Sequence, residues 1–343
     1  MDVYGSELAE KTVAELGDAM DAGELSAASI ATAYLERIGR IDPDLRSVIA
    51  VDPDAVDVAH GLDEERRTGL TRGPLHGIPV LVKDNIETAG GPPTTAGSLA
   101  LASARPERDA TLVARLREAG AVILGKANLS EWANFRSLRS SSGWSAVGGQ
   151  CRNPYALDRN PSGSSSGSGV AVSANLCAIA IGTETDGSIL SPSTHNGIVG
   201  HKPTVGVVSR AGVVPISHTQ DTPGPMTKTV ADAVAVLAAI AGRDERDAAT
   251  RDLDGAFVRR ENLQGVRIGV ARNLGEFAHA VVRLFEDAVD ALRSAGAVPA
   301  DVEVPHANEL DDPEWEVLQF EFKADIDAYL STAPGSVVHS LTT

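Results

Sequence analysis

The sequence predicts an α/β fold in which helices flank a central mixed, largely parallel β-sheet. Two observations carry this prediction. Short apolar runs of strand length alternate along the chain with segments whose apolar residues recur at helical spacing. Strands that alternate with helices favour parallel pairing within a layered fold. The length of 343 residues corresponds to one large domain or two ordinary ones.

The first predicted elements are two helices. Their apolar residues recur at helical spacing and are Val13, Leu16 and Met20, then Ile30, Tyr34, Leu35 and Ile38. The sequence Asp42-Pro43-Asp44 is a turn signal and is expected to break the second helical pattern.

A strand, a helix and a second strand come next. Residues 78–82 form a short apolar run that reads as a buried strand ending at Lys83. Asp109 is expected to cap the following helix, which Gly120 ends. Residues 121–124 read as the next strand.

The second half of the chain continues the alternation. Residues 143–212 are rich in Gly, Ser, Thr and Pro, but the apolar stretch 170–181 predicts a helix and a strand inside them. A helix capped by Thr229 is predicted over 230–241. A β-α-β unit follows, with strands at 268–270 and 302–304 around a helix from Val281 to Gly296. A last helical segment carries Phe320, Phe322, Ile326 and Leu330.

Composition excludes several classes of function. The net charge of −17 and the isoelectric point near 4.9 argue against nucleic acid or an anionic membrane as a partner. Cys151 and Cys177 form no CxxC pair, so neither a disulfide framework nor a structural zinc site is expected. Residues 1–7 are acidic, no signal peptide follows, and no apolar run is long enough to span a membrane. A cytoplasmic protein is expected.

Lys83 is the first candidate for chemistry. A lysine in water has a pKa of about 10.4 and is a poor base at neutral pH. Burial beside Val80, Leu81 and Val82 would disfavour the ammonium form, and the neutral amine could then take a proton from a hydroxyl group. The simpler alternative is a lysine that reaches solvent from the strand end and pairs with Asp84.

Two Gly- and Ser-rich segments offer nucleophiles. Residues 162–169 could be a flexible linker, and they lack the Gly-Lys-Ser/Thr of a phosphate-binding loop. Ser188 is the better candidate because it follows a predicted strand, and Gly187 permits a tight turn whose N–H groups can stabilise an oxyanion. A histidine base is disfavoured because no G-x-S-x-G elbow is present.

Together these segments resemble the amidase signature family. The resemblance runs through GIPVLVKDN at 77–85, GSSSGS at 163–168, GTETDGSI at 182–189 and DTPGPM at 221–226, within a signature core of about residues 60–245. Inside the family, ETDGS at 184–188 and the segments 128–136 and 149–155 are most similar to bacterial peptide amidases. The resemblance implies the layered amidase-signature fold and a single amidase domain over residues 1–343.

The resemblance also implies the roles of individual residues. Members of the family use a Ser–cis-Ser–Lys triad, which corresponds here to the nucleophile Ser188, the serine of a cis peptide bond Ser164 and the base Lys83. The backbone N–H groups of the oxyanion hole correspond to Thr185, Asp186, Gly187 and Ser188. No cofactor and no metal ion are expected in this chemistry.

The expected activity is hydrolysis of linear carboxamides, such as C-terminal peptide amides or small amides, through an acyl-enzyme. Two alternatives stay open: a glutamine-hydrolysing amidotransferase subunit that releases ammonia for a partner enzyme, and an inactive, truncated remnant. The second arises because family members are longer, so the chain is expected to lack their C-terminal portion. The expected partner is a peptide or small-molecule amide, and the sequence does not predict the oligomeric state.

Overall fold

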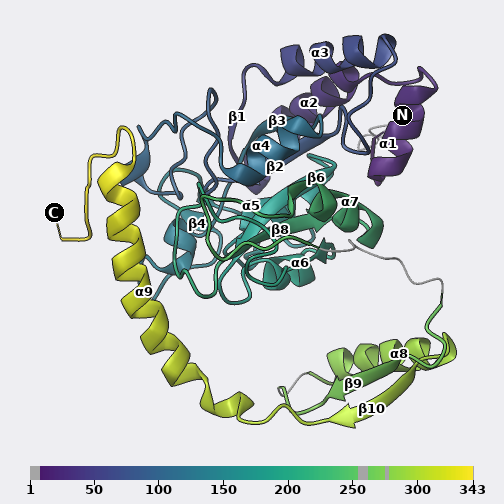
Figure 1. Cartoon of the computed structure of the whole chain (residues 1–343), viewed down its shortest axis with the longest axis vertical. Helices are drawn as coiled ribbons and strands as arrows, with labels where there is room; N and C mark the ends of the chain where they lie inside the picture. The colour runs from purple at the N-terminus through teal and green to yellow at the C-terminus, as the bar shows by residue number, and fades with distance from the viewer. Residues whose placement is uncertain (1–7, 254–261, 275–277, 343) are drawn as a thin grey trace. The chain divides into compact units, whose positions relative to one another are not determined.

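The computed structural model describes residues 8–253, 262–274 and 278–342, which fall into two compact units (Figure 1). The first unit comprises residues 1–254 and 321–343, and the second comprises residues 255–320. Residues 1–7, on which the expectation about a signal peptide rests, lie outside the described residues. The single domain expected over residues 1–343 remains a prediction.

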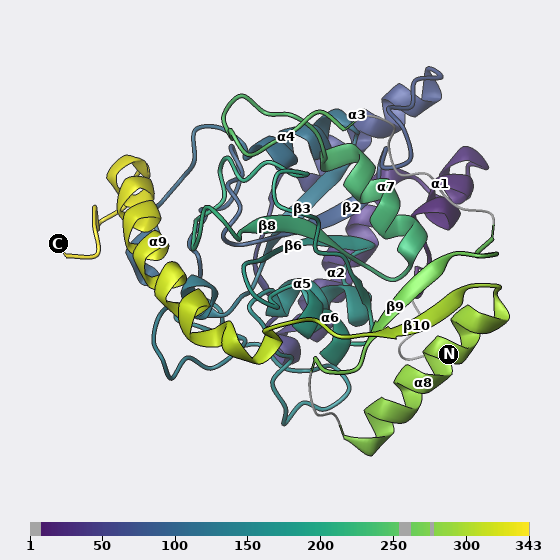
Figure 2. The same cartoon turned by 60° about the horizontal axis from the view of Figure 1, so that its bottom comes forward.

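A mixed sheet of six strands forms the centre of the first unit. Its strands, in spatial order, are β1 (Val48–Val51), β3 (Val122–Ala127), β2 (Pro79–Lys83), β6 (Ile179–Glu184), β8 (Thr222–Thr227) and β7 (Val199–Gly200). The strand β2 pairs in parallel with both β3 and β6, whereas β1, β8 and β7 pair antiparallel. Figure 2 shows β3, β2, β6 and β8 side by side. The α/β class is confirmed, with parallel pairing at the centre of the sheet.

Two α-helices open the described part of the chain, as predicted. They are α1 (Val13–Asp21), which Thr12 caps, and α2 (Ala27–Leu45). The predicted break at Asp42-Pro43-Asp44 is wrong, because α2 continues through Pro43 and ends where Arg46 adopts a left-handed φ of 54°. Pro43 lies in the last turn, and the Asp42 carboxylate accepts hydrogen bonds from the backbone N–H groups that follow the helix.

Of the two predicted helix caps, Thr229 is confirmed and Asp109 is wrong. Thr229 caps α7 (Val230–Ile240) as predicted, because its hydroxyl accepts from the N–H of Asp232 at 3.1 Å. Asp109 does not cap α4 (Thr111–Glu118). Its carboxylate instead accepts from the N–H of Ala89 at 2.8 Å and from Arg117 at 3.1 Å, since it lies one residue too early in the chain.

The remaining elements of the first unit surround the sheet. The α-helices are α3 (Ala55–Arg67), α5 (Ser166–Ser173) and α6 (Leu190–His195), with 3-10 turns η1 (Leu99–Leu101) and η2 (Glu131–Asn134) and a small hairpin of β4 (Trp144–Ser145) and β5 (Gly149–Gln150). Every residue of β2, β3 and β6 is buried. The helix α5 contacts β2, β3, β6 and β8, so the Ser-rich segment lies against the middle of the sheet rather than forming a linker.

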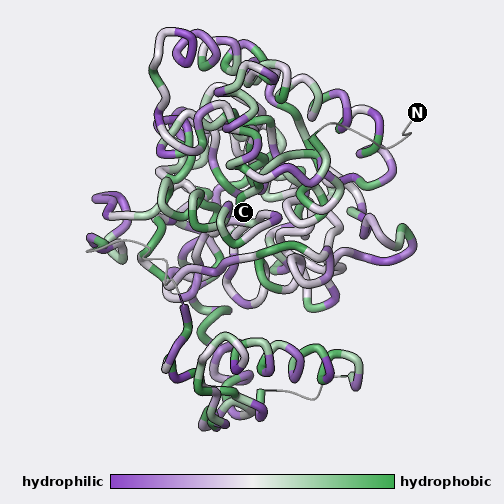
Figure 3. The backbone as a smooth tube through the Cα atoms, turned by 90° about the vertical axis from the view of Figure 1, so that its right-hand side faces the viewer, coloured by the Kyte–Doolittle hydropathy of each residue, from purple (hydrophilic) through white to green (hydrophobic). Residues whose placement is uncertain are grey.

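The second unit is the predicted β-α-β motif. It contains β9 (Arg267–Ala271), α8 (His279–Ser294) and β10 (Val298–Val302), and the two strands pair in parallel. The strand predicted at 302–304 is wrong by four residues, because Val298 already pairs with Arg267. Hydrophobic and hydrophilic residues alternate along α8 (Figure 3).

The last helix, α9 (Asp311–Thr332), follows the turn η3 (Ala307–Glu309), and its residues from Glu321 onward belong to the first unit. There Ile326 and Leu330 are buried in a small cluster with Leu101. Across the described ranges, no helix combines the length and the apolar character needed to cross a membrane.

Candidate active site

Lys83 lies at the carboxyl end of β2, in the centre of the sheet. The parallel register of β2 and β6, with Val82 opposite Ile181, brings the ends of both strands to the same edge. The Lys83 side chain is completely buried. Its Nζ lies 2.8 Å from Ser164 Oγ, 2.8 Å from Thr183 Oγ1 and 3.2 Å from the Thr183 carbonyl oxygen.

The simpler alternative for Lys83, a solvent-reaching side chain paired with Asp84, is wrong. The carboxylate of Asp84 is buried and faces Lys126, whose Nζ lies 3.8 Å from Asp84 Oδ1. Burial lowers the pKa of Lys83 to about 7, although the negative charges of Asp221 and Glu184 oppose this shift. A large share of Lys83 is therefore the neutral amine at neutral pH, and a neutral amine can accept a proton.

Ser164 is held directly beside this amine. The Gly163–Ser164 peptide bond is cis, and the Ser164 side chain is fully buried. Its carbonyl oxygen accepts a hydrogen bond from the N–H of Ser130 at 3.0 Å. The next residue, Ser165, donates from Oγ to the carbonyl oxygen of Thr183 at 3.0 Å, so the loop is fastened to β6.

Ser188 lies in the turn between β6 and α6. The N–H of Ser165 donates to its carbonyl oxygen at 3.1 Å, which joins the turn to the loop that carries Ser164. Gly187 has a φ of +74°, a conformation that favours glycine. Ser188 is 7% exposed. Its side chain is therefore largely enclosed by the protein.

Both ends of the turn from Thr185 to Ser188 are anchored by carboxylates. Glu184 Oε2 accepts from the N–H groups of Ile189 at 2.7 Å and Leu190 at 2.9 Å. Thr185 donates from Oγ1 to Asp221 Oδ1 at 2.5 Å. Such anchoring holds a turn in one conformation, which an oxyanion hole built from backbone N–H groups needs.

Sequence reasoning missed several residues of this site. Thr183 contacts Lys83 through both its hydroxyl and its carbonyl group, and Asn85 donates from Nδ2 to the Thr183 hydroxyl at 3.0 Å. Asp221 lies in the segment 221–226 that carried the family resemblance, but its contact with Thr185 spans 36 positions. No local pattern distinguishes Thr183 from the other residues of β6, because its contact with Lys83 depends on the pairing of β2 with β6.

Two histidines near the signature take structural positions. His76 is buried, and its Nε2 lies 3.0 Å from the carbonyl oxygen of Leu62. His195 is exposed, and its Nδ1 lies 2.9 Å from the carbonyl oxygen of Ser191. These contacts agree with the argument against a histidine base.

The fold and this arrangement of lysine and serines define the class of protein. The amidase family model matches residues 29–340, and the chain belongs to the amidase family. The resemblance inferred from the signature segments is thus confirmed.

Particular relatives are known by sequence and by structure. A probable amidase of Arabidopsis thaliana is 45% identical over 347 residues, which cover 97% of this chain and 66% of the relative. A glutamyl-tRNA(Gln) amidotransferase subunit of Acidothermus cellulolyticus is 42% identical over 88% of this chain and 60% of its own length. The native peptide amidase of Stenotrophomonas maltophilia superimposes with a TM-score of 0.92 at 52% identity, over 97% of this chain and 70% of that structure. The chain thus spans less than two thirds of the length of these two sequence relatives.

Proposed function

We propose that this protein is an amidase that hydrolyses linear carboxamides through Lys83, Ser164 and Ser188. The observation that carries the proposal is the 2.8 Å contact between the buried Lys83 amine and Ser164 Oγ, in a loop that is bonded to the nucleophile turn. A buried amine with a lowered pKa is a suitable general base at neutral pH.

The proposed reaction balances without a cofactor. Lys83 Nζ accepts the proton of Ser164 Oγ, and Ser164 Oγ accepts the proton of Ser188 Oγ as the latter bonds to the carbonyl carbon. The N–H groups of residues 185–188 stabilise the oxyanion. The proton returns through Ser164 to the amide nitrogen, the C–N bond breaks and ammonia leaves. Water then attacks the acyl-enzyme, releases the carboxylic acid and restores Ser188.

C-terminal peptide amides are the proposed substrates. The 52% identity to a solved peptide amidase supports this class. The second candidate is release of ammonia from glutamine, which the 42% identity to a glutamyl-tRNA(Gln) amidotransferase subunit supports. We favour the peptide amide because the segments ETDGS and 128–136 resemble peptide amidases.

Release of ammonia from defined substrates tests the proposal. Purified full-length protein is incubated with an N-acetylated dipeptide amide, with free glutamine and with the same dipeptide as a methylamide. We expect ammonia from the dipeptide amide, none after Ser188→Ala, and unchanged rates after Ser331→Ala, a serine exposed on α9. The methylamide can release only methylamine and therefore serves as the ammonia-free control. Faster release of ammonia from glutamine would favour the second candidate, and no ammonia from either the dipeptide amide or glutamine would contradict both.

A further inference from the structure

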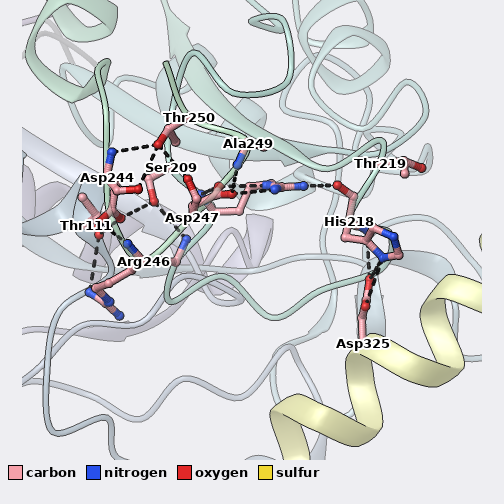
Figure 4. A network of polar contacts seen from close by, with 12 residues as sticks. Thr111, Ser209, His218, Thr219, Asp244, Arg246, Asp247, Ala249, Thr250 and Asp325 are labelled. Atoms are coloured by element: carbon pink, nitrogen blue, oxygen red, sulfur yellow. Dashed lines mark hydrogen bonds and ion pairs between the residues drawn. The ribbon is translucent and has the colours of Figure 1, made fainter. Parts of the chain in front are cut away.

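One histidine and two carboxylates, side chains of types that bind metal ions, lie together outside the triad, where α9 meets the loop that follows Ile216. His218, Glu321 and Asp325 each offer one ligand atom, and these three atoms lie within 4.8 Å of one another. Glu321 and Asp325 are four positions apart on α9 and therefore lie on the same face of the helix. Figure 4 shows His218 facing Asp325 of the helix.

The imidazole of His218 lies between the two carboxylates. Its Nδ1 is 3.0 Å from Asp325 Oδ2, and its Nε2 is 3.4 Å from Glu321 Oε1. These two distances start from different ring nitrogens, whereas one zinc ion would take a single nitrogen, bound at about 2.0–2.2 Å like the carboxylate oxygens. His218 is 59% exposed at its side chain, so the ring has room to turn one nitrogen toward both carboxylates.

Hydrogen bonds already orient the carboxylates. Glu321 Oε2 accepts from the N–H of Thr219 at 3.2 Å and from its hydroxyl at 2.9 Å, and it also accepts from the Ser217 hydroxyl. Asp325 Oδ2 accepts from the backbone N–H of His218 at 2.9 Å. Outer hydrogen bonds of this kind fix the orientation of ligands in metal sites and increase their affinity.

Arg210, a positive charge beside the cluster, is already paired with a carboxylate. Arg210 donates to the carbonyl oxygen of His218, but its guanidinium is paired with Asp247 through contacts of 2.9 and 2.6 Å. The ligand set therefore keeps two carboxylate charges in a chain whose net charge is −17. Both the local and the overall field attract a cation.

We propose that His218, Glu321 and Asp325 bind a divalent transition-metal ion, with Zn²⁺ as the preferred ion. Imidazole nitrogen suits zinc and its neighbours, whereas Mg²⁺ and Ca²⁺ prefer sets made of oxygen alone. Three protein ligands leave further positions to water. The site joins α9 to the loop of residues 216–221.

The position of the site connects it with the candidate active site. Asp221 Oδ2 accepts from the N–H groups of Ile216 at 2.8 Å and Ser217 at 3.0 Å, so it fixes the loop that carries His218. The other oxygen of Asp221 accepts from Thr185, which begins the turn of Ser188. An ion bound at His218 would hold this loop more firmly, and its influence on catalysis rests on the proposed function.

Calorimetry with zinc tests the site without any assay of activity. Chelator-treated full-length protein is titrated with Zn²⁺ and, separately, with Mg²⁺, and Co²⁺ absorption reports imidazole ligation. We expect one Zn²⁺ per chain, at least tenfold weaker binding in both His218→Asn and Asp325→Asn, and loss of the Co²⁺ spectrum in His218→Asn. Because no activity is measured, a failure of this site and a failure of the proposed hydrolase are separate results.

A matched histidine provides the control. His306 Nδ1 lies 3.0 Å from Glu309 Oε2, and both side chains are exposed. The cluster that could hold a metal ion among the described residues includes neither of them. His306→Asn should bind Zn²⁺ as the unchanged protein does. The proposal is overturned if the unchanged protein shows no saturable binding, if His218→Asn and Asp325→Asn both bind equally well while remaining folded by thermal unfolding, or if Mg²⁺ binds as tightly as Zn²⁺.

Discussion

Two fully buried lysines lie on neighbouring strands, and they differ in whether a carboxylate lies within ion-pair distance. Lys126 of β3 lies 3.8 Å from the Asp84 carboxylate and donates to Thr94 at 2.9 Å and to the Ile86 carbonyl. Burial lowers the pKa of Lys126 to about 8, with Asp84 opposing the shift. Lys83 forms no ion pair with any residue that the structure describes, and its pKa is about 7. Lys126, which has a carboxylate partner, is therefore interpreted as a structural lysine, and Lys83, which has none among the described residues, as the candidate base.

The lowered pKa of Lys83 predicts a pH-dependent contribution to stability. Between pH 7 and 10.5 the unfolded chain binds a proton at Lys83 that the folded chain lacks. The free energy of unfolding should therefore rise by about 1.4 kcal/mol per pH unit more steeply in the unchanged protein than in Lys83→Met. Below pH 7 both states are protonated and the difference should become constant.

Urea unfolding at a series of pH values measures this difference. Lys323→Met is the control, because Lys323 is exposed and pairs with Asp327 on the surface of α9. Parallel curves for the unchanged protein and Lys83→Met would show that Lys83 titrates as an ordinary lysine and would contradict the proposed base.

At the scale of elements, continuous apolar runs predicted the central strands well. The strands β2 and β6 are buried on both faces, and their apolar runs at 79–82 and 179–181 are easily recognised. The strands β4, β5 and β7 have two residues each, which is too short for any pattern. Contacts between distant positions, such as Lys83 with Thr183, depend on strand order, which local patterns do not contain.

The strand β8 was missed for a different reason. Its sequence, TPGPMT, contains two prolines and a glycine, which normally argue against a strand inside a sheet. The carbonyl oxygen of Pro225 accepts from the N–H of His201, so Pro223 and Pro225 direct their backbone polar groups toward the β7 side. On that side, β7 pairs with two residues of β8, Met226 and Thr227. The N–H groups that the two prolines lack would point to this side, so the hydrogen bonds between β8 and β6 are kept.

Close packing of α5 against the sheet predicts unequal effects of two glycine substitutions. A Cβ atom at Gly167 would lie 2.2 Å from the carbonyl oxygen of Ser47 and 2.5 Å from the N–H nitrogen of Asn128. Gly167→Ala should therefore lower the free energy of unfolding by about 1–3 kcal/mol. Gly17→Ala is the matched change, because α1 has open space at that position. It should raise stability by about 0.5–1 kcal/mol.

Chemical denaturation of both variants measures these effects. If Gly167→Ala were as stable as the unchanged protein, α5 would not approach the backbone of Ser47 and Asn128 as described. A loss of stability in Gly17→Ala would contradict the open helical environment of that residue.

At the scale of the whole molecule, the candidate chemistry is confined to the first unit. Lys83, Ser164 and Ser188 all lie on or beside the six-stranded sheet, whereas the second unit contributes a separate β-α-β motif. The sequence indicated the proposed triad because its members lie in recognisable segments. The sequence could not indicate that Asp221 and Glu184 hold the turn of Ser188, because these hydrogen bonds depend on the positions of the loops in the folded chain.

The two cysteines report on the integrity of the first unit. Cys151 and Cys177 are free and fully buried. Burial raises the pKa of Cys177 to about 12 and that of Cys151 well above its usual range. We expect neither thiol to react with Ellman's reagent in the native protein and both to react in guanidinium chloride. Rapid reaction of either thiol under native conditions would contradict the described core. The cytoplasmic location expected from the sequence remains a prediction.

The central claim is that a buried lysine activates Ser188 through Ser164. The most direct measurement is mass spectrometry of the full-length protein after reaction with a fluorophosphonate, together with Ser188→Ala, Ser164→Ala and Lys83→Ala. We predict one adduct, on Ser188, formed about 10²–10⁴ times more slowly when Lys83 or Ser164 is replaced. Folded protein that forms no adduct, or an adduct on Ser188 whose rate does not depend on Lys83, would contradict the account.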